Sequence, residues 1–125
     1  MKNDRVKIKS TEVLSERWGF LRNIILDYQK SDGSWETQVR EIYTNGNGAA
    51  ILLYNKEKRT VILTRQFRLP TYINGNDSGM SVEVCAGLLD GDAPEVCVKR
   101  EAEEETGYRL PKVEKGLEAY STPGA

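Results

Sequence analysis

Three glutamates have the type and spacing to carry chemistry. Glu101, Glu104 and Glu105 stand at i, i+3 and i+4, so a helix would place their carboxylates on one face within one turn. Such a cluster repels itself, and on a solvated helix a cation four residues away would relieve it. Carboxylate oxygens are the ligands that Mg²⁺ prefers. The cluster therefore predicts a divalent-cation site, and the alternative is a merely solvated acidic face.

Lysine and arginine stand four residues before glutamates on the neighbouring faces of this segment and could pair with them. Lys99 is expected to pair with Glu103, and Arg100 with Glu104. The other two glutamates of the cluster have no such partner. Two roles are open for Arg100. It could orient the glutamates, or it could form an ordinary ion pair with Glu104 along the helix, which would stabilise the helix by about 0.3–0.5 kcal/mol.

The segment that carries the glutamates has helix signals at both ends. Asp92 before Pro94 predicts the start, because an aspartate oxygen can accept a free amide hydrogen and proline has none to lose. Gly107 predicts the end. A strand over residues 81–85 precedes it and delivers Ala86 and Gly87. We therefore expect a strand, a glycine loop and then an acidic helix.

The N-terminal part reads as a small antiparallel meander. Alternating residues 6–9 predict a strand, and residues 20–28 and 35–44 predict two more around a turn at 30–34. Asn45-Gly46-Asn47-Gly48 then predicts a hinge, because glycine tolerates a left-handed backbone. We expect one domain over residues 1–45 and another over 46–125.

The second part contains long apolar runs. Residues 49–54 predict a central strand and residues 60–67 its hairpin partner. Residues 74–79 predict a long loop, and residues 113–120 suggest a further strand. The expected class is α/β (α+β).

Composition excludes several classes of protein. A net charge of −1 without a Lys/Arg cluster argues against nucleic acid as a partner. Apolar runs are too short for a membrane span, and the N-terminus lacks a signal-peptide pattern. Cys85 and Cys97 fit buried free thiols, so we expect a cytoplasmic protein. The absence of histidine leaves carboxylates and hard metals to carry any hydrolysis.

The segment from Gly87 to Tyr108 resembles the Nudix box, whose pattern is glycine, five residues, Glu, seven residues, then Arg-Glu-apolar-x-Glu-Glu-x-Gly-apolar. REAEEETGY, residues 100–108, matches the second half at each fixed position. The first half departs twice, since Ala93 replaces the glutamate and Arg100 follows Gly87 by thirteen residues where the pattern has fourteen. The segments REIYTNGNGAAILLYN, VILTRQFRLPTYINGN, SVEVCAGLLD and YSTPGA resemble the nucleotide-sugar subgroup of the Nudix hydrolases.

That resemblance implies an αβα sandwich around a mixed sheet, with a small antiparallel N-terminal β subdomain that joins a homodimer. It implies Mg²⁺, or Mn²⁺, held by the Ala86 carbonyl and by Glu101 and Glu105. Glu104 would support those ligands or hold another ion. Members of the subgroup run well beyond 125 residues. We therefore expect the C-terminal part to be absent here, and the general base to be a carboxylate beyond Ala125.

The implied reaction is metal-dependent cleavage of the pyrophosphate of GDP-mannose to GMP and mannose 1-phosphate. The alternatives are ADP-ribose hydrolysis, a non-catalytic nucleotide-binding module of the same fold, or a stable acidic domain without a ligand. Trp18 would stack on the base, although it could be a core residue, and Arg40 could be a plain surface residue. The resemblance assigns substrate contacts to Trp18, Arg40, Glu41, Arg68, Ala86 and Gly87, and the catalytic roles to Arg100 and the three glutamates of the cluster.

Overall fold

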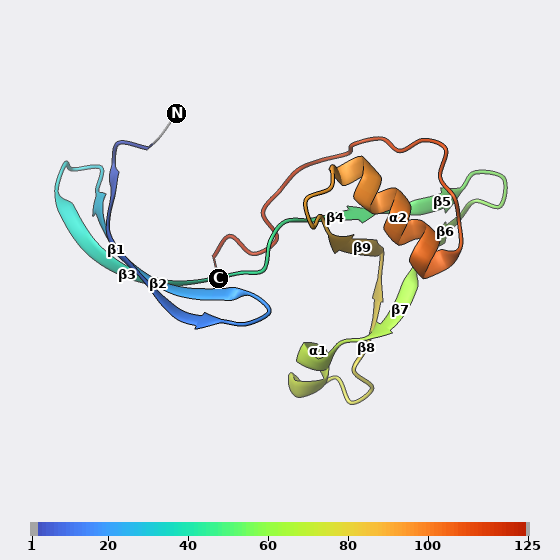
Figure 1. The fold of residues 1–125 in the computed structure, drawn as a ribbon, viewed down its shortest axis with the longest axis horizontal. Coiled ribbons are helices and arrows are strands. Elements are labelled where there is room, and N and C mark those ends of the chain that lie inside the picture. Colours follow the sequence, from blue (N-terminus) through green and yellow to red (C-terminus); the bar gives the residue numbers. More distant parts are fainter. Residues whose placement is uncertain (1–2, 125) are drawn as a thin grey trace. The chain divides into compact units, whose positions relative to one another are not determined.

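The computed structural model describes residues 3–124, which form two units. The first unit runs to Asn45 and includes the described residues from Leu117 onward. The second is Gly46–Gly116. Gly46 has the left-handed backbone that the sequence predicts for it (φ 102°). Figure 1 labels the helices and strands of the two units.

The first unit is an antiparallel sheet in the order β1-β2-β3. Its strands are β1 (Val6–Glu16), β2 (Phe20–Gln29) and β3 (Trp35–Thr44). The predictions for β2 and β3 are confirmed, but the prediction for β1 was too short. Two register shifts, between Ile8 and Ser10 and between Val13 and Ser15, interrupt the alternation on which the sequence prediction depended.

The second unit is built from two-stranded antiparallel pairs and two helices. The pairs are β4 with β9, β5 with β6, and β7 with β8. The elements are β4 (Gly48–Ile51), β5 (Leu53–Asn55), β6 (Thr60–Ile62), β7 (Thr64–Phe67), α1 (Leu69–Ile73), β8 (Met80–Glu83), β9 (Cys85–Leu88) and α2 (Pro94–Thr106).

Three runs expected as single strands are each divided into two. The breaks fall at Leu52, Leu63 and Val84, which lie outside any strand. The pairing partner changes at each break. At Leu52 it changes from β9, which pairs with β4, to β6, which pairs with β5. At Leu63 it changes from β5 to β8, and at Val84 from β7 to β4. The expectation of a central strand over residues 49–54 was wrong, because β4 and β5 lie in two-stranded sheets and Leu52 and Tyr54 are exposed. The apolar composition of a run does not show which strand it pairs with.

One other expectation was wrong, and one element was not predicted. Residues 113–120 contain no strand, and the short helix α1 precedes the loop at 74–79 without having been predicted. No helix within residues 3–124 has the length and apolar character needed to cross a membrane.

The core of the second unit lies between α2 and the strands. Leu53, Cys85 and Ala102 are buried together, and partly buried Ile51, Ile62 and Leu110 pack against them. Helix α2 contacts β9 and β4 (Figure 1). This packing fixes α2 against the strand that carries Ala86 and Gly87.

Candidate functional site

The ends of α2 differ in how well the sequence predicted them. The N-cap is Ala93 and makes no side-chain cap hydrogen bond, so the prediction of Asp92 as the cap was wrong. Pro94 is the first helical residue, as expected. Gly107 ends the helix with φ 77°, and its N–H donates to the Glu103 carbonyl, which confirms the predicted stop.

Gly87 and Glu101 lie in direct apposition. A Cβ on Gly87 would stand 2.2 Å from Glu101 Cδ and 2.3 Å from its Oε1, so any other residue there would force the Glu101 side chain to move. The side chain of Glu101 is only 15% exposed. The Cys97 thiol donates to the carbonyl oxygens of Leu88, at 3.3 Å, and Gly87, at 3.7 Å. The glycine strand and the acidic helix therefore meet at the Glu101 carboxylate.

Arg100 links two acids. Its Nη1 lies 3.3 Å from Glu101 Oε1, and its Nε lies 3.7 Å from Asp92 Oδ2. Burial alone would lower the Arg100 pKa, but the charges of Glu101, Glu104 and Asp92 outweigh it and raise the pKa. Arg100 contacts Glu101 and not Glu104 as an ion pair, which favours the orienting role over the plain helix pair.

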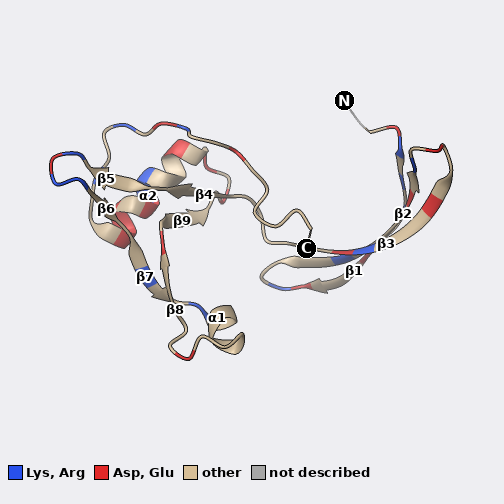
Figure 2. Cartoon of the chain, turned by 180° about the vertical axis from the view of Figure 1, so that it is seen from behind, with Lys and Arg blue, Asp and Glu red and all other residues tan. Residues whose placement is uncertain are grey.

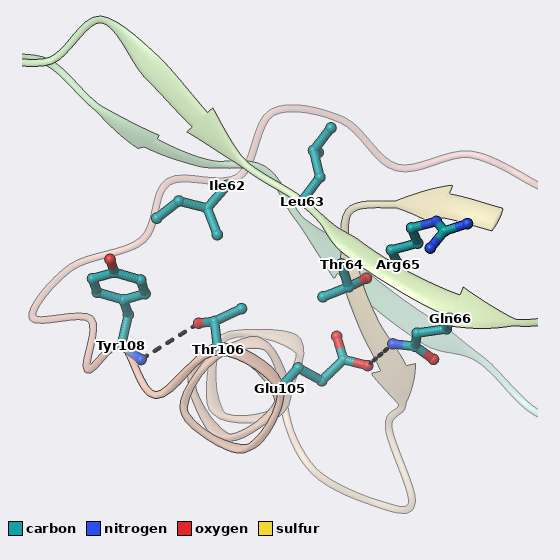
Figure 3. A pocket seen from close by; sticks show the side chains of 8 residues that line it. All are labelled: Ile62, Leu63, Thr64, Arg65, Gln66, Glu105, Thr106 and Tyr108. Carbon is teal, nitrogen blue, oxygen red and sulfur yellow. Dashed lines mark hydrogen bonds between the residues drawn. The ribbon is translucent and has the colours of Figure 1, made fainter. Parts of the chain in front are cut away.

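Glu105 extends from α2 toward β7 (Figure 3). Gln66 Nε2 donates a hydrogen bond to Glu105 Oε1. The other carboxylate oxygen, Oε2, is buried and has no hydrogen-bond partner within residues 3–124. The two side chains line a cavity of about 430 Å³ together with Ile62, Leu63, Thr64, Arg65, Thr106 and Tyr108.

Cys85 lies close to the same carboxylates. Its side chain is fully buried. Burial raises the pKa of the Cys85 thiol, and the Glu105 carboxylate raises it further through its negative charge and through a hydrogen bond with the thiol. The thiol therefore stays protonated and uncharged near neutral pH, and the negative charge of this region resides on the glutamates.

Arg68 forms a two-pronged pair within the chain. Its Nε and Nη2 donate to the Glu83 carboxylate at 3.0 and 2.8 Å. The hydrogen bond from Arg68, followed by one from Ser81, lowers the Glu83 pKa. The charge of Glu105 also contributes to the raised Arg68 pKa, after the effects of Glu83 and burial. Arg68 thus lies within electrostatic reach of the acidic helix.

The exposed face of α2 is paired differently from the sequence prediction. Lys99 Nζ contacts Glu95 Oε1 at 2.8 Å and not Glu103, because a glutamate four residues before a lysine is the more favourable order. Glu103 instead pairs with Arg109 at 2.7 Å. The acidic bands along α2 are visible in Figure 2.

The three clustered glutamates have different surroundings. Glu104 is exposed, whereas Glu101 and Glu105 are partly buried against the strands. In the described part of the chain, no three His, Cys, Asp or Glu side chains already form a cage for a metal ion. Ala86, whose carbonyl is expected to be a ligand, is an exposed residue of β9 paired with Ala50.

The other expected substrate residues lie in the first unit. Trp18 is 74% exposed, so it is not a core residue of the described chain. Arg40 is exposed on β3 and donates to Gln38 and to the Val39 carbonyl. Glu41 is exposed and stands opposite Asn23 in the sheet.

Sequence reasoning missed three residues at this site, namely Gln66, Glu83 and Asp92. Only Asp92 had a signal: counting back eight positions from Arg100 reaches it, which is where the Nudix pattern has its first glutamate. On that count the missing residue of the loop lies before Asp92, and Asp92 stands at the position of the glutamate, whereas counting forward from Gly87 gives Ala93. Gln66 and Glu83 had no signal because only the strand pairing brings them to the helix.

Comparison with known proteins shows the family of the chain. Residues 5–43 match the family model of the GDP-mannose pyrophosphatase NudK N-terminal domain, and residues 44–122 match that of the NUDIX domain. The chain is 54% identical over 121 residues to the GDP-mannose pyrophosphatase of Yersinia pestis (strain Pestoides F), covering 95% of this chain and 61% of that protein. It is 53% identical to the one of Cronobacter sakazakii (strain ATCC BAA-894), with 95% and 62% covered.

A solved structure described as an ADP compounds hydrolase shares the fold. The TM-score is 0.65 at 20% identity, and the match covers 90% of this chain and 56% of that one. This likeness confirms the expected mixed α/β Nudix fold. The chain spans about three fifths of the length of the curated relatives it matches. With the family model covering residues 44–122 and the glycine strand set against the acidic helix, the chain belongs to the Nudix family.

Proposed function

We propose that the protein hydrolyses the pyrophosphate bond of a nucleoside diphosphate sugar, with GDP-mannose as the substrate and GMP and mannose 1-phosphate as the products. The observation that carries the proposal is the Glu105 carboxylate, which keeps one oxygen buried and unpartnered within residues 3–124. A buried ionised oxygen is costly unless something compensates it. The similarity to two GDP-mannose pyrophosphatases supports the choice of substrate.

The donor set fits a divalent cation. Nudix hydrolases generally need one. Glu101 and Glu105 would hold Mg²⁺, or Mn²⁺, together with the Ala86 carbonyl, and the exposed Glu104 would support them or hold another ion. Few protein ligands suffice, because magnesium keeps waters and binds substrate phosphates. When bound, the cation would screen the pyrophosphate charge and lower the pKa of a bound water.

Residues of the chain would supply the remaining contacts. Glu83 occupies the Nε–Nη2 edge of Arg68, and we assign the Nη1 edge to a phosphate or sugar oxygen. Gly87 admits the Glu101 carboxylate, and Arg100 orients it. In the first unit, the exposed Trp18 would stack on the base, while Arg40 and Glu41 would contact the nucleotide.

We also propose a homodimer in the cytoplasm. Large apolar side chains of the first unit are exposed, including Ile8 (58%), Val39 (55%) and Tyr43 (53%), and a second copy would cover them. Two free thiols, Cys85 and Cys97, suit a reducing compartment. Light scattering coupled to gel filtration tests the dimer, and a monomer at all concentrations would exclude it.

The decisive experiment is product analysis with GDP-mannose, ADP-ribose and other nucleotide sugars, with and without Mg²⁺. We expect GDP-mannose cleavage that requires the metal. Removal of supporting groups around a metal typically costs about 10–100-fold, so Glu105→Gln, which removes a ligand, should lose at least about 100-fold. Glu103→Gln is the matched control, because Glu103 lies on the same helix but pairs with Arg109. Full turnover by Glu105→Gln at saturating Mg²⁺ would exclude the proposal.

A further inference from the structure

Gln66 makes the hydrogen bond that joins β7 to the acidic helix. It lies 39 residues from Glu105 in sequence, and both side chains are partly buried. A carboxylate only accepts hydrogen bonds, so the Gln66 amide must present its N–H₂ group. A hydrogen bond to an ionised partner is roughly twice as strong as a neutral one. The contact therefore fixes both the position and the rotation of the Glu105 carboxylate.

Fixing the Glu105 carboxylate also fixes where its second oxygen, Oε2, lies. With Oε1 held by Gln66, the buried Oε2 accepts no hydrogen bond from an N–H or O–H group within residues 3–124, and the Cys85 thiol beside this carboxylate is only a weak donor. If the contact served stability alone, leaving a buried anionic oxygen unpaired would work against it. Burial combined with an open coordination position is the state that a cation ligand needs before the ion arrives.

We propose that Gln66 is a positioning residue for Glu105, holding the carboxylate so that Oε2 is presented to a divalent cation. This inference rests on the proposed function, because it takes Glu105 as a ligand. Gln66 itself touches neither the cation nor the substrate. The alternative is that it merely ties β7 to α2.

Its strand provides a matched control. Thr64 lies two residues before Gln66 on β7, on the same side of the strand, and lines the same cavity (Figure 3). Thr64 Oγ1 donates to the backbone carbonyl of Glu83 and not to a carboxylate of α2. Thr64→Val therefore removes a neighbouring hydrogen bond without touching Glu105.

The test is titration of the metal-free protein with Mn²⁺, followed by electron paramagnetic resonance. Gln66→Met keeps the length of the side chain but removes the donor, and we expect the Mn²⁺ affinity to fall about 10–100-fold. Gln66→Asn keeps the amide group but is one methylene too short to reach Glu105, so its Mn²⁺ affinity should fall by the same factor. This second variant serves as the test if Gln66→Met does not fold. Thr64→Val should bind Mn²⁺ as the wild type does.

A double-mutant cycle separates positioning from a structural tie. In a Glu105→Gln background, Gln66→Met should leave the residual Mn²⁺ affinity unchanged, because the carboxylate it positions is gone. Wild-type affinity in both folded Gln66 variants, or equal losses with and without Glu105, would overturn the inference while leaving the metal site intact. Absence of Mn²⁺ binding by the wild type would instead overturn the proposed function, and this inference with it.

Discussion

Gly87 of β9 lies against Glu101 of α2 so closely that a Cβ atom on the glycine would stand 2.2 Å from the carboxyl carbon. The backbone of Gly87 does not have a left-handed φ, so conformation alone does not require glycine there. The requirement is space. The position of a candidate metal ligand thus depends on a missing side chain in the neighbouring strand.

Gly87→Ala should therefore displace the Glu101 carboxylate and weaken the site. The clash is with a flexible side chain that can move, so the loss of stability should not exceed the roughly 1–3 kcal/mol of overpacking a core. The checks are urea denaturation and Mn²⁺ affinity. Gly116→Ala is the control, since nothing lies within 4 Å of its Cβ position, and its unfolding free energy should change by less than about 1 kcal/mol. Equal behaviour of the two variants would contradict the steric argument.

Arg100→Lys should reduce activity with little effect on stability. Lysine keeps the charge but loses the planar fork that reaches Glu101 and Asp92 together. Both ion pairs involve partly exposed arginine, so the unfolding free energy should change by less than about 1 kcal/mol. We expect about a 10–100-fold loss of kcat/KM for GDP-mannose. Activity equal to the wild type would leave Arg100 with a helix-pair role only.

Trp18→Ala should raise KM more than it lowers kcat. Stacking on a base is worth about 1–3 kcal/mol, and at 74% exposure the side chain adds little to the fold. Trp35→Ala is the aromatic control in the same unit. The Lys7 ammonium lies 3.9 Å from the Trp35 ring centroid, so loss of the ring should lower stability and spare KM. Steady-state kinetics with GDP-mannose and thermal melts of both variants decide the matter. An unchanged KM for Trp18→Ala would place the nucleotide elsewhere.

Acid should weaken the fold through Glu83. The hydrogen bond from Arg68, followed by that from Ser81, holds the pKa of Glu83 below its ordinary value of 4.5. A lowered folded-state pKa stabilises the fold above the unfolded pKa, and that contribution disappears as the pH falls through the folded pKa. Below about pH 4.5, the unfolding free energy of the wild type should therefore fall more steeply than that of Glu83→Gln.

Urea unfolding at a series of pH values measures this difference. Glu57→Gln, in the turn between β5 and β6, is the control and should follow the wild-type curve. Parallel curves for the wild type and Glu83→Gln would show that the Arg68 pair contributes no pH-dependent stability.

The sequence by itself determined the local features of this protein. Proline and glycine set the start and end of α2, apolar alternation set β2 and β3, and the second half of the Nudix motif identified the family and the acidic face. These signals lie within a few residues of one another, so backbone sterics and side-chain periodicity suffice to produce them.

Tertiary structure decided which of those features meet. Strands change their pairing partners at Leu52, Leu63 and Val84. Two side-chain contacts also join residues that are far apart in the chain, Gln66 with Glu105 and Arg68 with Glu83. Asp92 shows the same limit locally, since it satisfied the rule for a cap yet pairs with Arg100, about two turns into the helix. A side chain with two available partners pairs with the one that packing brings within reach. The distance to each partner is set by the tertiary structure and cannot be read from the order of residues.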